Sequence, residues 1–399
     1  MKVLLSAYAC EPGRGSEPDL GFQTMLTLAE YHQVWVLTKQ NNVPSLEAYL
    51  SSDPRASRIT LVGLDLGPVV SRIKRQTHLG LLWYYHWWQS KAGRIADELE
   101  KTISFDAVFH ITFASYWMRV GVASVEKPLL LGPVGGGVEA PLGLLSELGW
   151  RGVLAEFFRS VGRRSLFRLP SVRLAAKKAA AIFVNNPETA HRVRRGTKAP
   201  ITILPNPTAV RVPATLPPDR IPTRDIAFVG RLIPWKGAHL AIRVMRYVKA
   251  RDARLVIFGD GPDKRRLERR IAKWRLGDRV VLVGEIARTD LLDRLSRCGA
   301  LIHPALHEEG GNAVAEALAM EVPVVCLNRG GPPLTLKLFP QFGSVAITPT
   351  TPSRTARDMA AVLDRILVRS EPRGEQTHRA SLSFGREILA ALDAMTDTR

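Results

Sequence analysis

The chain is poor in cysteine and has no long apolar run, and each of these two features argues against particular classes of protein. Its three cysteines, Cys10, Cys298 and Cys326, form no CxxC pair, which argues against a zinc site or a disulfide framework and predicts a reducing, cytoplasmic compartment. No apolar stretch reaches the roughly 20 residues that span a bilayer, so we expect no transmembrane anchor. The sequence has no DxD element with flanking carboxylates, so we expect no metal site on a diphosphate.

The size and composition of the chain indicate two globular domains. Its 399 residues exceed what one hydrophobic core usually supports, and its hydrophobic fraction of 46% and charged fraction of 23% are those of a soluble protein. The first ten residues, MKVLLSAYAC, mimic a short secretion signal. Their apolar core is at the lower limit of length for a signal, and we interpret Val3–Ala9 as the first buried strand.

The net charge of +19 points to an anionic partner, either nucleic acid, anionic lipid or a phosphorylated small molecule. The window Arg151–Lys178 holds eight basic residues against Glu156 alone. Large apolar side chains such as Trp150, Phe157 and Phe158 interleave with its arginines. This pattern predicts that residues 150–178 contact an anionic membrane surface; the alternative is a solvated helix face.

Short continuous apolar runs alternate with longer mixed segments, which is typical of parallel strands buried on both faces with helical crossovers. The expected strands are Val3–Ala9, Val34–Thr38, Ile59–Leu64, Ala107–Thr112, Leu129–Leu131, Ala181–Asn185, Ile226–Val229, Leu255–Phe258, Val280–Val283, Ala300–Ile302 and Val324–Leu327. The fold class is therefore α/β, with two Rossmann-like doubly wound domains at 1–207 and 225–380 and a proline-rich linker at 208–224. A closing helix is expected at 381–395 and can pack back on the first domain. In such folds ligands bind beyond the carboxyl ends of the strands, so the cleft between the domains is the expected site.

The segment GRLIPWKG places two cations beside a glycine turn. The strand Ile226–Val229 ends at Gly230, and Arg231 and Lys236 precede the next helix. Backbone N–H groups at a helix start, the helix dipole and cationic side chains all favour phosphate. An ordinary strand end with surface cations is the alternative.

The segment HEEGGNAVAEALA holds two carboxylates around a glycine pair. Gly310 and Gly311 permit close backbone approach to a ligand, and Asn312 is a suitable cap for a helix at 313–320. Glu308 precedes that helix and Glu316 lies on its second turn, so the two are expected to bind different parts of one ligand through vicinal hydroxyls. Either could instead be a surface charge, and Glu309 competes with Glu308 for the role.

HEEGGNAVAEALA resembles the EX7E motif of retaining glycosyltransferases of family 4, which have the GT-B fold. GRLIPWKG, VIFGDGPDKRRLE, VVLVGE, PVV and LPNP follow in that family's order, so the resemblance covers most of the chain. The sequence departs from the family's motif at one place, where Glu309-Gly310 replace the usual Gly-Phe. The resemblance implies a nucleoside diphosphate sugar, UDP- or GDP-linked, as donor substrate and no separate cofactor or metal. It assigns the diphosphate to Arg231 and Lys236, the donor sugar to Glu308, the sugar and phosphate to Gly310, Gly311 and Asn312, the ribose to Glu316, and a further donor contact to Gly284.

The N-terminal half resembles the same family less strongly. In CEPGRGSEPDLGF, Gly15 and Ser16 correspond to a loop near donor phosphate or acceptor, and Glu17 either contacts the acceptor or caps the following helix. The spacing of its glycines is not that of a dinucleotide fingerprint, which argues against an NAD site.

The strand segment DAVFHIT ends near a histidine, His110, that the resemblance places on the donor sugar. A lone histidine on an apolar strand is otherwise a buried core residue. The segment GPVGGGVEAP holds adjacent glycines that suggest close backbone approach to the acceptor, or else a flexible turn. Gly136, Gly137 and Glu139 are the acceptor-site candidates there.

Together these features predict a membrane-associated, metal-independent hexosyltransferase on the inner face of the cell membrane. It acts on a sugar or lipid-linked acceptor, in cell-surface polysaccharide or glycolipid assembly. A sugar-nucleotide epimerase of the same fold is the alternative enzyme. A nucleic-acid-binding protein is favoured only by charge, above all in Lys264–Arg275, and no recognised nucleic-acid module supports it. The aromatic segment Leu66–Trp88 is either an acceptor loop or a buried helix.

Overall fold

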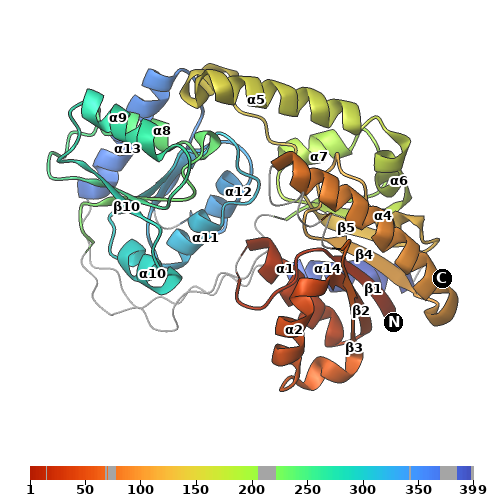
Figure 1. Ribbon diagram of the computed structural model, residues 1–399. Coiled ribbons are helices and arrows are strands. Elements are labelled where there is room, and N and C mark those ends of the chain that lie inside the picture. The colour runs from red at the N-terminus through yellow and green to blue at the C-terminus, as the bar shows by residue number, and fades with distance from the viewer. Residues whose placement is uncertain are drawn as a thin grey trace. The chain divides into compact units, whose positions relative to one another are not determined.

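The structure, a computed structural model, describes residues 1–14, 16–67, 70, 78–204, 222–340, 343–368 and 384–396. Within them the chain forms two compact units (Figure 1). The first unit comprises Met1–Gly137, Gly162–Ala209 and Leu382–Arg399, and the second comprises Val138–Val161 and Val210–Ser381. Most of the predicted linker, 208–221, lies outside the described residues, as do Gly15 and the side chain of Ser16.

The first unit is built on a seven-stranded parallel sheet of order β3-β2-β1-β4-β5-β6-β7. Its strands are β1 (Lys2–Ala7), β2 (Gln33–Lys39), β3 (Ile59–Leu64), β4 (Ala107–Ile111), β5 (Leu129–Val134), β6 (Ala179–Val184) and β7 (Ile201–Ile203). The central strands are buried throughout: Val3, Leu4 and Leu5 of β1 have no exposed surface. Continuous apolar runs are therefore what the covered sheet requires.

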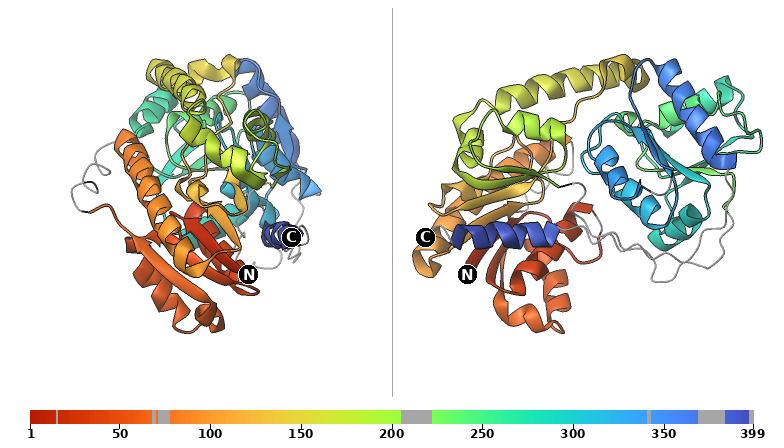
Figure 2. Two further views of the ribbon diagram at one scale, coloured as in Figure 1. Left: turned by 90° about the vertical axis from the view of Figure 1, so that its right-hand side faces the viewer. Right: turned by 180° about the vertical axis from the view of Figure 1, so that it is seen from behind.

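Helices cover both faces of this sheet. One hydrophobic core joins the sheet to α1 (Ser16–Ala29), α2 (Val43–Leu50) and α14 (Phe384–Thr396). The other core joins it to α4 (His78–Ile103), α6 (Pro170–Lys178) and α7 (Pro187–Val193). Figure 2 shows α14, in dark blue, alongside the first unit, where its Ile388 and Leu392 are buried in the core with α1.

The second unit is built on a six-stranded parallel sheet of order β10-β9-β8-β11-β12-β13. Its strands are β8 (Ile226–Val229), β9 (Leu255–Phe258), β10 (Val280–Gly284), β11 (Ala300–His303), β12 (Val324–Leu327) and β13 (Val345–Ile347). One core joins the sheet to α8 (Ala238–Val244), α9 (Lys264–Lys273) and α13 (Pro352–Val368). The other joins it to α10 (Arg288–Ser296), α11 (Asn312–Ala319) and α12 (Pro332–Lys337).

The segment Val138–Val161 belongs to the second unit, although it precedes β6 and β7 of the first and the sequence prediction placed it in 1–207. It includes most of α5 (Leu145–Leu166), whose Leu148 is buried in the core with α8 and α9. The buried carboxylate of Glu147 accepts hydrogen bonds from Arg243 Nε at 2.8 Å and Arg270 Nη1 at 2.5 Å. Apolar burial and a buried ion pair thus hold the segment there, and neither is visible in its local periodicity.

Two doubly wound α/β units confirm the predicted fold class. All the expected strands are present, and none of their ends differs from the observed end by more than three residues. Two strands were missed, β7 and β13, because each has three residues and none of these residues is fully buried. Short, half-exposed strands give too little hydrophobic periodicity to predict.

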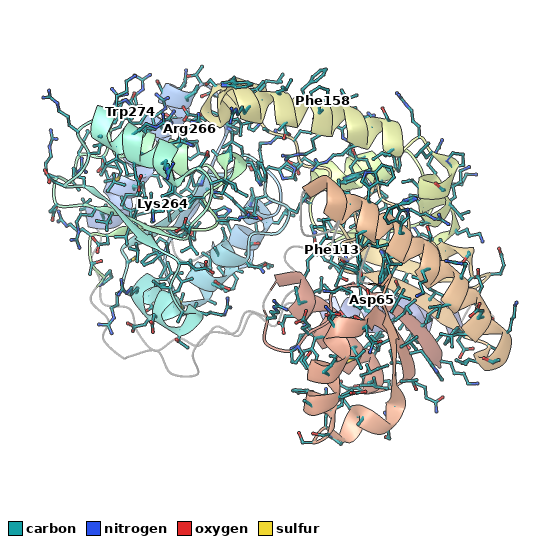
Figure 3. The ribbon with its side chains drawn as sticks, in the orientation of Figure 1. Asp65, Phe113, Phe158, Lys264, Arg266 and Trp274 are labelled. Atoms are coloured by element: carbon teal, nitrogen blue, oxygen red, sulfur yellow. The ribbon has the colours of Figure 1, made fainter. Side chains whose placement is uncertain are left out.

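The sequence predicts either an acceptor loop or a buried helix for Leu66–Trp88, and the described part of this segment from His78 onward is the start of α4. Tyr84, Tyr85 and Trp88 are buried in the first unit, whereas Trp83 and Trp87 are exposed. Tyr84 Oη donates a hydrogen bond to Asp65 at 3.0 Å, and Figure 3 labels Asp65 beside this region. Among the described helices, none is both long and apolar enough to cross a membrane.

Candidate active site

The loops at the carboxyl ends of the second unit's strands are tied together by backbone hydrogen bonds. Leu232 N–H, after β8, donates to Asp260 O, after β9, at 2.9 Å. Leu306 N–H, after β11, donates to Trp235 O at 2.9 Å. Since each loop is held by a neighbour, these bonds constrain the backbone from which the candidate side chains project.

Two glycines allow these loops to approach each other. Gly237 has φ 80° at the start of α8, and a Cβ there would overlap the carbonyl oxygen of Pro304. Gly330 has φ 68°, and a Cβ there would overlap the carbonyl oxygen of Glu308. Both positions therefore require glycine. The close approach brings the loop of Lys236 against the loop of Glu308.

Lys236 and Glu308 form an ion pair at this edge. Lys236 Nζ lies 2.5 Å from Glu308 Oε2, and His303 Nε2 lies 3.2 Å from the same oxygen. Burial alone would raise the pKa of the Glu308 carboxyl, but the Lys236 ammonium and the hydrogen bond to His303 outweigh it and hold the pKa well below its ordinary value. Glu308 is thus an anion whose side chain is 14% exposed, available to accept hydrogen bonds from a ligand.

Arg231 lies on the loop between Gly230 and Lys236. Its side chain is exposed and has no hydrogen bond or ion pair among the described residues. A guanidinium in this state can form bidentate hydrogen bonds to a phosphate without first breaking an internal contact.

The helix after the glycine pair begins one residue earlier than expected. The structure places Gly311, with φ 86°, in the N-cap position and Asn312 as the first residue of α11. The prediction of Asn312 as the cap is wrong, because Gly311 takes up the left-handed turn that enters the helix. The half-buried Gly310 precedes it. The positive end of the helix dipole at this helix start favours an anion.

Glu316 and Glu309, the other two glutamates of the motif, have different partners. Glu316 is nearly buried on α11, and its Oε1 accepts a hydrogen bond from Arg288 Nη2 at 2.7 Å. Glu309 Oε1 accepts from the Val138 N–H at 3.3 Å. Glu308, with two side-chain partners of its own, is therefore distinct from Glu309, and the three carboxylates do not form one cluster.

Gly284 ends β10 at the same edge of the sheet. Its φ is 88°, a Cβ built there would meet no atom within 4 Å, and its carbonyl accepts from Gly259 N–H at 2.7 Å. The backbone of Gly284 therefore faces open space, which is what close approach of a ligand to this residue requires.

In the first unit, His110 is buried on β4 and only 1% exposed. Its Nδ1 lies 3.1 Å from Ser6 Oγ and its Nε2 lies 3.3 Å from Tyr85 Oη. Burial lowers the pKa of His110 to about 4, so the ring is neutral near pH 7. His110 also lines an apolar cavity with Tyr116 and Phe167. Sequence reasoning missed Ser6 and Tyr85, since both look like ordinary strand and helix residues.

Glu17 lies on α1 and contacts the backbone after β4. Its Oε2 accepts a hydrogen bond from Phe113 N–H at 3.2 Å, and Phe113 is labelled in Figure 3. Burial raises the pKa of Glu17 to about 7, although the Phe113 hydrogen bond opposes the shift. Thr112 and Phe113 have φ 64° and 51°, a strained pair of non-glycine residues. Strain of this kind is common at functional sites.

The three acceptor-site candidates after β5 divide between the units. Gly136 has φ 91°, and Gly137 N–H donates to Thr189 Oγ1 at 3.1 Å, both in the first unit. A Cβ on Gly137 would overlap the backbone of Thr189, so this glycine is required for packing. Glu139 is half-buried and belongs to the second unit.

Among the described residues, no group of three or more His, Cys, Asp or Glu side chains could hold a metal ion. The three cysteines are buried, and no disulfide joins them. His303 was not selected from the sequence as a site residue, although its place at the end of β11, five residues before Glu308, was a usable signal.

Comparison with known proteins relates both the sequence and the fold to glycosyltransferases. Residues 221–366 match the family model described as Glycosyl transferases group 1. The 2-deoxystreptamine glucosyltransferase of Streptomyces kanamyceticus is 30% identical over 172 residues, 41% of this chain and 40% of that protein. The chain spans less than half the length of the first curated relatives that it matches.

Two solved structures resemble the chain over its whole length. Sucrose-phosphate synthase from Thermosynechococcus elongatus has a TM-score of 0.63 at 16% identity, with 100% of both chains covered. HepE from Anabaena, solved in complex with UDP-glucose, has a TM-score of 0.58 at 16% identity, with 99% of this chain and 100% of that chain covered. At such low identity the likeness establishes the fold, and it confirms the predicted GT-B class.

Proposed function

We propose that this chain, whose residues 221–366 match the family model of glycosyl transferases group 1, is a retaining glycosyltransferase. It moves a hexose from a nucleoside diphosphate sugar, UDP- or GDP-linked, to a sugar or lipid-linked acceptor. The observation that carries the proposal is the ion pair of Lys236 and Glu308, which fixes a cation and an ionised carboxylate at the carboxyl edge of the second sheet.

Each charged group at that edge has a part in donor binding. Lys236 and the exposed Arg231 neutralise the diphosphate, together with the N–H groups at the start of α11. Glu308 accepts hydrogen bonds from hydroxyls of the donor sugar, and Glu316, kept in place by Arg288, accepts those of the ribose. Gly284, Gly310 and Gly311 admit the ligand close to the backbone, and Asn312 lies at the same helix start.

The reaction needs stabilisation of a leaving diphosphate more than it needs a nucleophile. As the bond between the sugar C1 and the diphosphate oxygen breaks, negative charge grows on the diphosphate, where Lys236 and Arg231 are bound. The acceptor hydroxyl attacks the same face of the oxocarbenium-like sugar, and its proton passes to the departing diphosphate oxygen. Glu308 orients the sugar throughout. Fixed cations supply the charge stabilisation, so the proposed mechanism is metal-independent.

The first unit supplies the acceptor side. Besides the acceptor contacts it supplies one contact to the donor: neutral His110 hydrogen-bonds to a hydroxyl of the donor sugar, as its resemblance to the family histidine implies. Glu17, with a pKa near 7, either donates or accepts a hydrogen bond near neutral pH. Gly136 and Gly137 shape the same loop edge, and Glu139 is a further acceptor contact.

The protein is proposed to act at the inner, cytoplasmic face of the cell membrane, in cell-surface polysaccharide or glycolipid assembly. Trp150, Phe157 and Phe158 of α5 are all more than half exposed, and Figure 3 labels Phe158 on this helix. Exposed aromatics beside arginines suit the interface of an anionic membrane. Residues 150–178 are the proposed contact.

The test is a transfer assay with a matched donor and acceptor. Lys236→Ala and Glu308→Ala are expected to lose about 100-fold or more in kcat/KM, whereas Lys249→Ala, which removes an exposed lysine elsewhere in the second unit, keeps the wild-type rate. Thermal unfolding of each variant checks that it folds. Wild-type rates in both site variants would refute the proposal. Incubation with donor alone separates an epimerase, which isomerises the sugar without an acceptor.

A further inference from the structure

Five arginines line one pocket in the first unit, outside the residues assigned to donor and acceptor. They come from the end of α5, from α6 with the segment before it, and from α7 with the turn after it. They are Arg164, Arg168, Arg173, Arg192 and Arg195. No acidic side chain is found among the described residues that line this arginine pocket. A concavity lined by five guanidinium groups has a positive potential that attracts an anion.

The contacts of two of these arginines show what the pocket offers an anion. Arg173 Nε is buried and has no hydrogen-bond partner among the described residues. Arg195 Nη2 lies 3.1 Å from His191 Nε2, so an imidazole, rather than a carboxylate, faces it. A buried donor without a partner is costly and favours a ligand that can accept its hydrogen bond.

Two aromatic rings also line the arginine pocket. They are those of Tyr116 and Phe167, with ring centroids 5.3 Å apart in an edge-to-face arrangement. The same two rings line the apolar cavity that contains His110. The arginine pocket and the cavity of the predicted catalytic histidine therefore share two lining residues.

The helices that carry the arginines also expose aliphatic side chains. Leu166 ends α5, Leu169 precedes α6 and Leu174 lies on α6, and all three are exposed. An arginine pocket beside exposed leucines matches an amphiphile whose anionic head enters the pocket while its chains lie against the leucines. A soluble sugar phosphate would gain nothing from the exposed leucines.

We propose that the arginine pocket binds the phosphate monoester or diphosphate head of a lipid. Guanidinium groups pair with phosphate oxygens in bidentate fashion, and a dianionic head makes use of more of the five arginines than a monoanionic phosphodiester does. The inference deepens the proposed membrane contact and rests on it. It adds a chemical selectivity that a diffuse basic surface lacks.

The test measures binding of the full chain to vesicles without any turnover. Phosphatidylcholine vesicles carry either phosphatidic acid, a monoester, or phosphatidylglycerol, a diester, at matched zeta potential. Wild type is expected to prefer phosphatidic acid by about tenfold. Arg168→Gln with Arg195→Gln abolishes that preference, and Arg151→Gln with Arg194→Gln, two exposed arginines that do not line the pocket, preserves it even if overall binding falls.

Equal binding to both vesicle types by wild type, or an equal loss of preference in both double variants, would overturn the proposal. Glycerol 3-phosphate, a monoester without acyl chains, tests the lipid source. If the pocket variant lost binding of glycerol 3-phosphate and bound vesicles as wild type does, the lipid assignment would be wrong. Transfer to a soluble acceptor is measured in parallel, so failure of the lipid site is distinguishable from failure of the proposed enzyme.

Discussion

The carboxyl edges of the two sheets carry opposite kinds of chemistry. In the second unit the edge is charged: Glu308 is ionised beside Lys236, and Arg231 is exposed. In the first unit burial has removed charge: His110 is neutral and Glu17 is half-protonated near pH 7. A charged edge suits a diphosphate, and an edge of neutral hydrogen-bonding groups suits a hydroxyl acceptor. The same sheet architecture thus provides two different sites because its loops differ.

The largest expected effect is the loss of stability when a buried ion pair of the second unit is broken. Glu147→Ala leaves Arg243 and Arg270 without their carboxylate and is expected to cost about 3–5 kcal/mol of unfolding free energy. Glu126→Ala in the first unit removes a largely exposed partner of Lys178 and should cost about 0–1 kcal/mol. Chemical denaturation measures the unfolding free energy of both variants. Similar losses in the two would contradict the contrast between a buried and an exposed ion pair.

The next effect concerns the charge of Glu308 itself. Glu308→Gln keeps the shape of the side chain and removes its charge, so kcat/KM is expected to fall about 100-fold. Glu17→Gln assayed at pH 6, where Glu17 is mostly protonated, should lose less than about tenfold. Initial rates of both variants with a common donor and acceptor measure the two losses in kcat/KM. Equal losses would show that the two edges do not differ as described.

The pH dependence of stability should separate the two edges as well. Glu17 has a folded pKa raised to about 7, so the folded state binds more protons and stability falls as pH rises from about 4.5 to 7. In Glu17→Gln this fall is absent, a difference on the order of 3 kcal/mol. His110, with its pKa lowered to about 4, has the opposite sign: stability falls as pH drops from 6.5 to 4.

In the second unit, the stability contributed by Glu308 depends on pH in the opposite direction to that of Glu17. Its folded pKa lies below the ordinary value, so its carboxylate stabilises the fold at neutral pH and that contribution is lost as pH falls below about 4.5. Urea unfolding from about pH 2 to about pH 8 follows each variant, so that the range below pH 4.5 is covered. If Glu17→Gln and Glu308→Gln changed the profile in the same pH range, the assigned environments would be wrong.

The fold and the motif of the second unit could be predicted from sequence because both are local. Buried parallel strands appear as continuous apolar runs, and Glu308 and Glu316 are close in the chain to the glycines that position them. The partners of these residues could not be predicted. Arg288 reaches Glu316 from a different helix, and His110 is paired with Ser6 across 104 positions. Such contacts depend on which strands become neighbours.

The smallest expected effect concerns the open backbone at Gly284. Alanine there must adopt φ 88° and is expected to cost about 1 kcal/mol. Gly277, which also has open space but no positive φ, is the matched control, and Gly277→Ala should be neutral or slightly stabilising. Thermal unfolding compares the two. Donor affinity should also fall in Gly284→Ala, because a methyl group then occupies space next to the ligand.

The central claim is that the charged edge of the second unit binds a diphosphate. Calorimetric titration of wild type and Lys236→Ala with a nucleoside diphosphate and its monophosphate tests this claim most directly. We predict that wild type binds the diphosphate about tenfold or more tightly than the monophosphate, and that Lys236→Ala loses this preference while it still binds the monophosphate. Equal affinity of wild type for the two nucleotides, or an unchanged preference in Lys236→Ala, would contradict the account.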